Sequence, residues 1–107
     1  DHLTGLFNRR RFQDELERML ASFGRDQRCF ALLFFDLDEF KYINDSFGHR
    51  AGDSVLIRIS GELTTLVRSN VFLSRLGGDE FGLLAPVKNR EEALKLAERV
   101  VQAIASL

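Results

Sequence analysis

The stretch "VFLSRLGGDEFGLLAPV" (residues 71–87) has two apolar runs separated by two glycines and two acids. Short apolar runs bounded by glycine and rich in branched and aromatic residues are typical of strands, so we expect strands over 71–76 and 80–87. Gly77-Gly78 predicts a two-residue turn, because such hairpin turns need positive φ. The stretch therefore predicts an antiparallel hairpin with two carboxylates at its tip.

Before this hairpin, the sequence indicates one more strand and three helices. "CFALLFFDL" (29–37) is a continuous apolar run ended by acids, which favours a central strand covered on both faces. Cys29 is then expected to be a small buried residue. The spacing predicts helices over 9–23, 39–47 and 51–67, with a loop over 24–28 after the first and Gly48 closing the second.

A last helix is predicted after the hairpin. Asn89 and Glu92 form an N-x-x-E pattern akin to a capping box, which marks a helix start. Both terminal helices carry an apolar stripe that we expect to be buried. The stripes are Phe12, Leu16, Met19, Leu20 and Phe23 in the first helix, and Ala93, Leu96, Ala97, Val100, Val101 and Ile104 in the last.

The predicted element order indicates an α+β fold. After the first helix it is strand, helices, strand, strand, helix, which is the ferredoxin-like βαββα pattern without its last strand. In that arrangement the third strand lies between the first and second, antiparallel to both. The end of the first strand then meets the hairpin tip. We therefore expect Asp36 to lie beside Asp79 and Glu80.

Length and composition fit a single domain. The chain has 107 residues, 45 % of them hydrophobic, with 15 basic and 16 acidic side chains and a net charge of −1. So balanced a charge argues against nucleic acid or a membrane surface as partner. No apolar stretch approaches the roughly 18 residues of a spanning helix, and no secretory leader is visible. We expect a cytoplasmic location, either free or as the cytoplasmic part of a membrane-anchored protein.

The expected acidic cluster has two interpretations. Carboxylates gathered at one sheet end repel one another unless a cation lies between them, and oxygen ligands favour Mg²⁺, above all where phosphates complete its shell. Glycines beside them would let a phosphate chain approach the backbone. Alternatively, the hairpin tip is an ordinary solvated turn, and Asp36 and Asp38 only terminate a strand. Metal-assisted phosphoryl or nucleotidyl transfer is the functional interpretation.

Three motifs resemble the GGDEF domains, the diguanylate cyclase family. "RLGGDEF" (75–81) resembles their signature, "DHLTGLFNRR" (1–10) resembles their opening segment, and "FFDLDEFKYINDSFGHRAGDSVL" (34–56) resembles their central motif. The resemblance implies condensation of two GTP molecules into cyclic di-GMP with release of two pyrophosphates, one GTP being bound by each of two facing domains. It implies Mg²⁺ as the cofactor, with Mn²⁺ as an alternative ion.

The resemblance also implies roles for individual residues. Asp36, the Leu37 carbonyl and Asp79 would ligate the metal, with Glu80 as a second-tier ligand. Asp79 would help deprotonate the attacking 3′-hydroxyl, and Glu80 and Lys41 would complete the catalytic set, with Lys41 facing the phosphates. The substrate-binding residues would be Phe40, Asn44, His49, Asp53, Gly77 and Gly78. Asn44 and Asp53 would read the guanine edge. Each of these residues also has a purely structural interpretation, as a solvated helix or turn residue or, for Phe40, as core.

The sequence departs from the family pattern in two places, and each departure leads to an expectation. Many members have an R-x-x-D pair that binds the product, whereas here "RSNV" retains Arg68 and has Val71 in the aspartate position. We expect no strong product inhibition through this broken site. The chain also resembles only about the N-terminal two thirds of the family domain. We therefore expect residues 1–107 to be a single, incomplete GGDEF domain that turns over poorly alone.

The resemblance leaves two kinds of function open. One is an active cyclase domain in a longer signalling protein, with neighbouring sensory and phosphodiesterase domains as partners. The other is a catalytically silent module that binds GTP or acts as a scaffold for a neighbouring domain. The intact signature over 77–81 favours the cyclase.

Overall fold

The computed structural model describes residues 1–26 and 29–105, and for 23–26 it describes the backbone alone. Its elements are α1 (Arg9–Asp26), β1 (Cys29–Asp36), α2 (Phe40–Phe47), α3 (His49–Leu66), β2 (Phe72–Arg75), β3 (Glu80–Val87) and α4 (Arg90–Ala105). Every predicted helix and strand is present. The loop predicted over 24–28 was wrong for 24–26, where α1 continues, and residues 27–28 lie outside the described residues.

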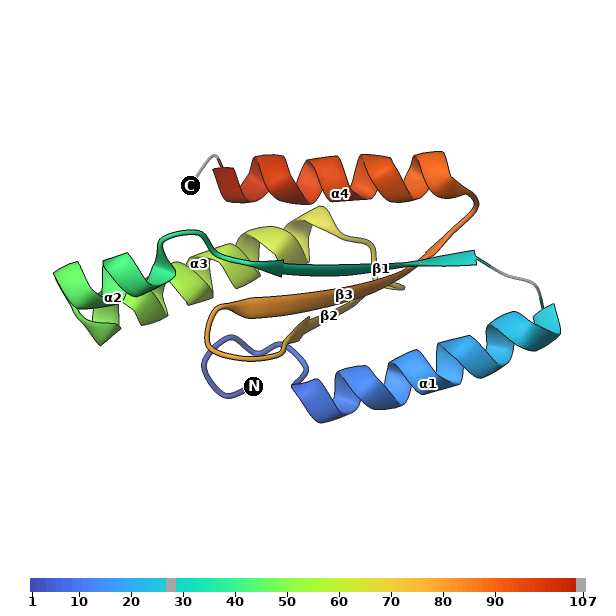
Figure 1. The fold of residues 1–107 in the computed structure, drawn as a ribbon, viewed down its shortest axis with the longest axis horizontal. Helices are drawn as coiled ribbons and strands as arrows, with labels where there is room; N and C mark the ends of the chain where they lie inside the picture. Colours follow the sequence, from blue (N-terminus) through green and yellow to red (C-terminus); the bar gives the residue numbers. More distant parts are fainter. Residues whose placement is uncertain (27–28, 106–107) are drawn as a thin grey trace.

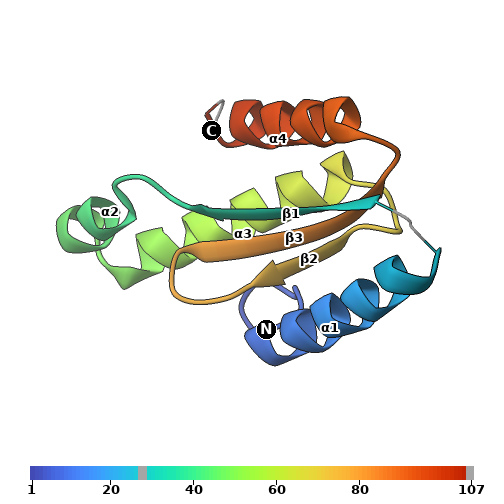
Figure 2. The same cartoon turned by 45° about the vertical axis from the view of Figure 1, so that its right-hand side comes forward.

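The three strands form an antiparallel sheet in the order β1-β3-β2. Leu83 of β3 pairs with Leu33 of β1 on one side and with Leu73 of β2 on the other. This confirms the α+β fold and the central place of the third strand. Helix α1 covers one face of the sheet, and α3 and α4 cover the other (Figure 1; Figure 2).

Side chains that alternate along the strands fill a separate core on each face. Toward α3 and α4, Phe81 and Leu83 pack with Leu63 in a cluster from which solvent is excluded. Toward α1, Leu84 packs with Phe12 in a smaller cluster. The period of two in a strand explains why neighbouring residues of β3 serve opposite cores.

β1 is less covered than its apolar sequence predicts. Among the described strands it pairs only with β3, so it is an edge of this sheet. Phe34 is 63 % exposed and Leu32 is 41 % exposed, although the Phe34 ring still contacts Phe12 of α1. Cys29, at the strand's start, is exposed as well. The prediction of a central strand covered on both faces, with a buried Cys29, was therefore wrong.

The helix ends follow the sequence signals, but the buried stripes are narrower than expected. The Asn89 side chain accepts a hydrogen bond from the Glu92 backbone N–H at 2.9 Å, as a cap should. Of the α4 stripe only Val100 is fully buried, whereas Val101 is 65 % exposed. Successive helix residues point about 100° apart, so one sheet face cannot cover both. In α1, Leu20 is exposed, and the side chain of Phe23 lies outside the described residues.

The connection between β2 and β3 is a hairpin, but not the predicted two-residue turn. Four residues separate the strands, and the N–H groups of Leu76 and Gly77 both donate to the Glu80 carbonyl, at 2.8 and 3.4 Å. Neither Gly77 nor Gly78 has a positive φ. A four-residue loop can reverse the chain without left-handed residues. Glycine at position 77 has a different reason, which is space. A Cβ there would lie 3.3 Å from the Glu80 carboxylate, which is closer than an ordinary van der Waals contact.

Candidate active site

The end of β1 meets the β2–β3 loop, as the predicted topology requires. Asp36 is paired directly with Glu80 across the two strands. One residue further on, the Leu37 N–H donates to the Asp79 carbonyl at 3.2 Å. Asp36 and Glu80 line a hollow of about 300 Å³ at this end of the sheet. The structure therefore brings the backbones of the three acids that the sequence singled out to one end of the sheet.

The three carboxylates differ in their surroundings. In the described part of the chain, the Asp36 and Asp79 carboxylates have no hydrogen-bond or ion-pair partner. Glu80 faces Arg9 of α1, with its Oε2 atom 3.5 Å from the guanidinium. Both partners of this pair are more than half exposed, so the pair stabilises the fold little. Of the three carboxylates, only Glu80 thus has a cationic partner in the described part of the chain.

The donor set fits a hard cation that brings further ligands with it. Among the side chains that the structure describes, those of residues 1–22 and 29–105, no group of three or more His, Cys, Asp or Glu is placed to enclose a metal. Mg²⁺ does not need such a cage, because it usually takes one or two carboxylates and completes its shell with water and phosphate oxygens. A pair of carboxylates with a backbone carbonyl suits that mode of binding.

Arg75 holds the acidic loop in place, a role that the sequence analysis missed. Its guanidinium donates to the carbonyls of Gly77 and Gly78 at 3.0 to 3.2 Å, and to the Asp1 carboxylate at 3.2 Å. Asp1 in turn accepts from the N–H and hydroxyl of Thr4. One side chain therefore ties the opening segment of the chain to the loop. The position of Arg75 inside the quoted signature was a signal that could have drawn attention to it.

The loop after β1 has a constrained backbone. Leu37 is buried, and its carbonyl accepts a hydrogen bond of 3.4 Å from the Phe40 N–H. A carbonyl oxygen has a second lone pair, so the implied metal role of Leu37 stays open to it. Glu39 adopts a left-handed conformation with φ 62°, which costs a non-glycine residue about 1–2 kcal/mol. Such strain persists where the surrounding structure fixes it, commonly at functional sites.

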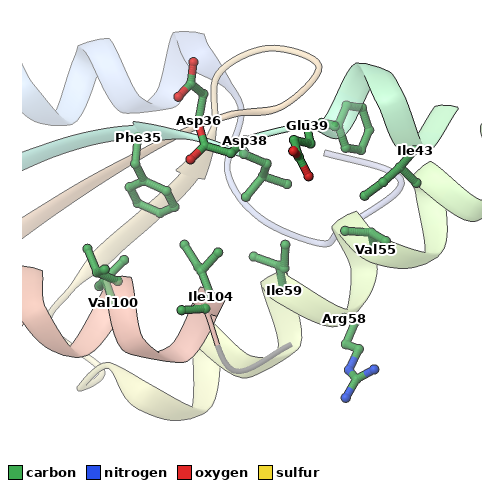
Figure 3. Close-up of a pocket in the computed structure, with 14 residues that line it drawn as sticks. Phe35, Asp36, Asp38, Glu39, Ile43, Val55, Arg58, Ile59, Val100 and Ile104 are labelled. Carbon is green, nitrogen blue, oxygen red and sulfur yellow. The ribbon is translucent and has the colours of Figure 1, made fainter. Parts of the chain in front are cut away.

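An apolar groove of about 630 Å³ lies beneath this loop. Figure 3 shows Phe35 on one side and Ile59, Val100 and Ile104 on the other, with Asp36 at the rim. Of the predicted site residues, Asp36, Leu37 and Phe40 line the groove, whereas Asn44, His49 and Asp53 do not. The groove is therefore separate from the residues expected to read a base.

The predicted nucleotide-binding residues lie on α2 and at the start of α3. Lys41, His49 and Asp53 are exposed, and within the described ranges their side chains make no hydrogen bond or ion pair. Asn44 is half-buried and packs against Gly52, next to Asp53 in the chain. The structure thus places Asn44 and Asp53 at one junction of α2 and α3. The roles of these residues stay predictions.

The family assignment follows from comparison with known proteins. The sequence matches the family described as "Diguanylate cyclase, GGDEF domain" over residues 1–107. The chain belongs to this GGDEF family. This match confirms the resemblance that three sequence motifs indicated.

Named relatives and solved structures agree with the GGDEF assignment. The chain is 44 % identical over 104 residues to "Probable diguanylate cyclase DgcE" of Escherichia coli, covering 97 % of this chain and 9 % of the relative. It is also 44 % identical over 104 residues to "Bifunctional diguanylate cyclase/cyclic di-GMP phosphodiesterase MucR" of Pseudomonas aeruginosa, covering 97 % of this chain and 15 % of MucR. The chain thus spans only a small part of these relatives.

The solved diguanylate cyclase SiaD of Pseudomonas aeruginosa, in complex with its activator SiaC, has the same fold. It superposes with a TM-score of 0.94 at 36 % identity, covering all of this chain and 41 % of SiaD. No helix in the described ranges of this GGDEF domain has the length and apolar character needed to span a bilayer.

The two positions of the expected product-binding pair, Arg68 and Val71, lie at the turn after α3. Arg68 is exposed in the turn after α3, where its carbonyl accepts a 3.0 Å hydrogen bond from the Val71 N–H. The Val71 side chain packs against the main core. The position where many family members carry an aspartate therefore contributes apolar packing here, and Arg68 has no acid beside it in sequence.

Proposed function

We propose that this chain supplies one half of a diguanylate cyclase active site. In the proposed reaction two GTP molecules condense into cyclic di-GMP and two pyrophosphates are released, with one GTP on each of two facing GGDEF domains. The observation that carries the proposal is the cross-strand pairing of Asp36 with Glu80, which places the end of β1 against the loop of Asp79. Membership of the GGDEF family supports it.

The carboxylates at this junction have distinct proposed roles. Asp36 and Asp79, with the Leu37 carbonyl, would hold Mg²⁺, and Glu80 would be a weaker ligand because it faces Arg9. When bound, the ion would neutralise charge on the triphosphate. Asp79 would accept the proton of a 3′-hydroxyl as that oxygen bonds to the α-phosphorus of the facing GTP. The bond from that phosphorus to the pyrophosphate oxygen breaks at the same centre.

The α2–α3 junction would select the base. Asp53 can accept hydrogen bonds from both the ring N–H and the exocyclic amine of guanine, a donor pair that adenine lacks. A site built for those donors rejects adenine because its own polar groups would be left unpaired. Asn44 would donate to the guanine carbonyl, Lys41 would face the phosphates, and Phe40 and His49 would form the wall. Gly77 and Gly78 would let the phosphates approach the backbone.

Catalysis requires a partner domain. Each GGDEF domain would bind a single GTP, so the reaction needs a second copy facing the first. The name of the relative MucR records both cyclase and phosphodiesterase activities in one protein. We propose by analogy that the protein containing this chain has regulatory neighbours, sensory domains and a phosphodiesterase domain among them.

The test is cyclic di-GMP formation by the full-length protein with GTP and Mg²⁺, followed by chromatography. Asp79→Asn keeps the size of the side chain but removes the charge and the proton acceptor, so we expect the rate to fall about a hundredfold or more. Asp36→Asn should also be strongly impaired. Asp14→Asn, an exposed change on α1, is the matched control and should leave the rate unchanged.

Two results would contradict the proposal. Undiminished synthesis by the Asp79→Asn variant would remove the carboxylate mechanism. Binding of GTP by the unaltered protein with no product would instead point to the silent, GTP-binding kind of GGDEF module.

A further inference from the structure

Gly52 occupies an unfavourable position for its residue type. It is the fourth residue of α3 and is buried. Glycine is, after proline, the poorest helix former, so its presence inside a helix calls for a packing reason. Gly61 in the same helix offers a comparison, because a Cβ there would meet nothing within 4 Å.

The packing reason at Gly52 is the side chain of Asn44. A Cβ added to Gly52 would lie 1.8 Å from Asn44 Oδ1 and 2.9 Å from its Cγ. It would also lie 3.2 Å from the Phe40 ring. No real Cβ tolerates the first of these distances. Because the Asn44 carboxamide is on α2 and can rotate, an alanine at this position would turn it away.

The two ends of the Asn44 carboxamide have different surroundings. Its Oδ1 atom is buried and has no hydrogen-bond partner within the described part of the chain, whereas its amide nitrogen is not among the buried unpaired atoms there. The oxygen is thus turned inward against Gly52. The NH₂ group is the half of the carboxamide left for a ligand. Leaving an acceptor unpaired costs stability, which is tolerated where a side chain must be held for another purpose.

We propose that Gly52 is a positioning residue that increases the preference for guanine over adenine by leaving room for the inward orientation of the Asn44 oxygen. The inference rests on the proposed function, in which Asn44 reads the base. Guanine has a carbonyl acceptor at the ring position where adenine has an amino donor. An NH₂ group held outward pairs with the former and opposes the latter, and a site with a mismatched polar group rejects its ligand strongly.

The experiment measures affinities of the full-length protein for non-hydrolysable analogues of GTP and ATP, with Mg²⁺, by calorimetry. Gly52→Ala should weaken GTP-analogue binding about tenfold, the equivalent of one hydrogen bond, and leave ATP-analogue binding nearly unchanged. Gly61→Ala should change neither affinity. Circular dichroism and thermal unfolding establish that each variant is folded.

A double variant tests whether Gly52 acts through Asn44. Asn44→Ala should lower the guanine preference by a similar factor, and adding Gly52→Ala to it should lower it no further. Asn44→Asp tests the orientation even if Gly52→Ala fails to fold. It replaces the outward donor by an acceptor, so the guanine preference should fall at least as far as in Asn44→Ala. If the side-chain oxygen of Asn44, and not its NH₂ group, already faced the base, the guanine preference would survive the Asn44→Asp substitution.

The outcomes separate this inference from the function beneath it. An unaltered protein that binds both analogues equally overturns the proposed base selection, and the inference with it. An unaltered protein that prefers the GTP analogue, with Gly52→Ala retaining that preference or with losses that add to those of Asn44→Ala, overturns the role of Gly52 alone.

Discussion

We expect Val71 to weaken binding of cyclic di-GMP at the turn after α3. Its side chain packs against the core at the position where the family resemblance expects a carboxylate, so Arg68 is exposed without that acid beside it in sequence. An exposed cation forms weak ion pairs, because solvent and salt screen it.

We therefore expect cyclic di-GMP to bind this site only weakly, at about ten micromolar or above by calorimetry, and Arg68→Ala to change that little. Arg10→Ala, an exposed cation of α1 that does not line the hollow beside Arg68, is the control. Sub-micromolar binding that disappears in Arg68→Ala would show that the site works without its aspartate.

At the scale of single residues, the sequence could predict which residues come close together, but not how their side chains are oriented. The pairing of Asp36 with Glu80 follows from the strand order alone, and it was confirmed. The Arg9 contact of Glu80 depends on where α1 crosses the sheet edge, which no local pattern contains. The packing of Gly52 against Asn44 was likewise invisible, although a glycine inside a helical pattern is a signal worth pursuing.

Among the elements, the β2–β3 loop depends most on a single side chain. Arg75 is only 19 % exposed and bridges two loop carbonyls and the Asp1 carboxylate. Hydrogen bonds that involve charged groups contribute more than neutral ones, and losing this side chain would release both the loop and the opening segment.

We expect Arg75→Ala to lower the free energy of unfolding by about 1.5–3 kcal/mol, measured by urea denaturation. Arg10→Ala, an exposed arginine of α1 that forms no hydrogen bond or ion pair within the described residues, should stay within about 0.5 kcal/mol of the unaltered protein. Equal losses in the two variants would show that the contacts of Arg75 do not hold the loop.

The sequence predicted which helices and strands form, but it predicted less well how buried their residues are and how they are connected. The hairpin, the Asn89 cap and the helix break at Gly48 come from local chemistry, and each was found. Two predictions were wrong: the positive φ at Gly77-Gly78 and the burial of Val101. The turn depends on how the two strands are placed, which a local pattern does not specify. Val101 points about 100° away from Val100 around α4, beyond the side that the sheet covers.

At the scale of the molecule, one face of the sheet carries α1 and the other carries α3 and α4 (Figure 2). The acidic junction lies at the end of this sandwich where β1 leads into α2, beside the loop that Arg75 holds. Among the described strands β1 is an edge, and its Phe34 side chain is exposed; that residues 1–107 are an incomplete domain stays a prediction.

The central claim is that Asp36 and Asp79 bind one divalent ion between them. The most direct measurement is anomalous diffraction from crystals of the protein grown with Mn²⁺ and a non-hydrolysable GTP analogue. We predict a single strong peak at direct ligand distance, about 2.1 Å for an ion of this kind, from carboxylate oxygens of both residues. A peak that touches only one of the two carboxylates, or that lies away from both, would contradict the account.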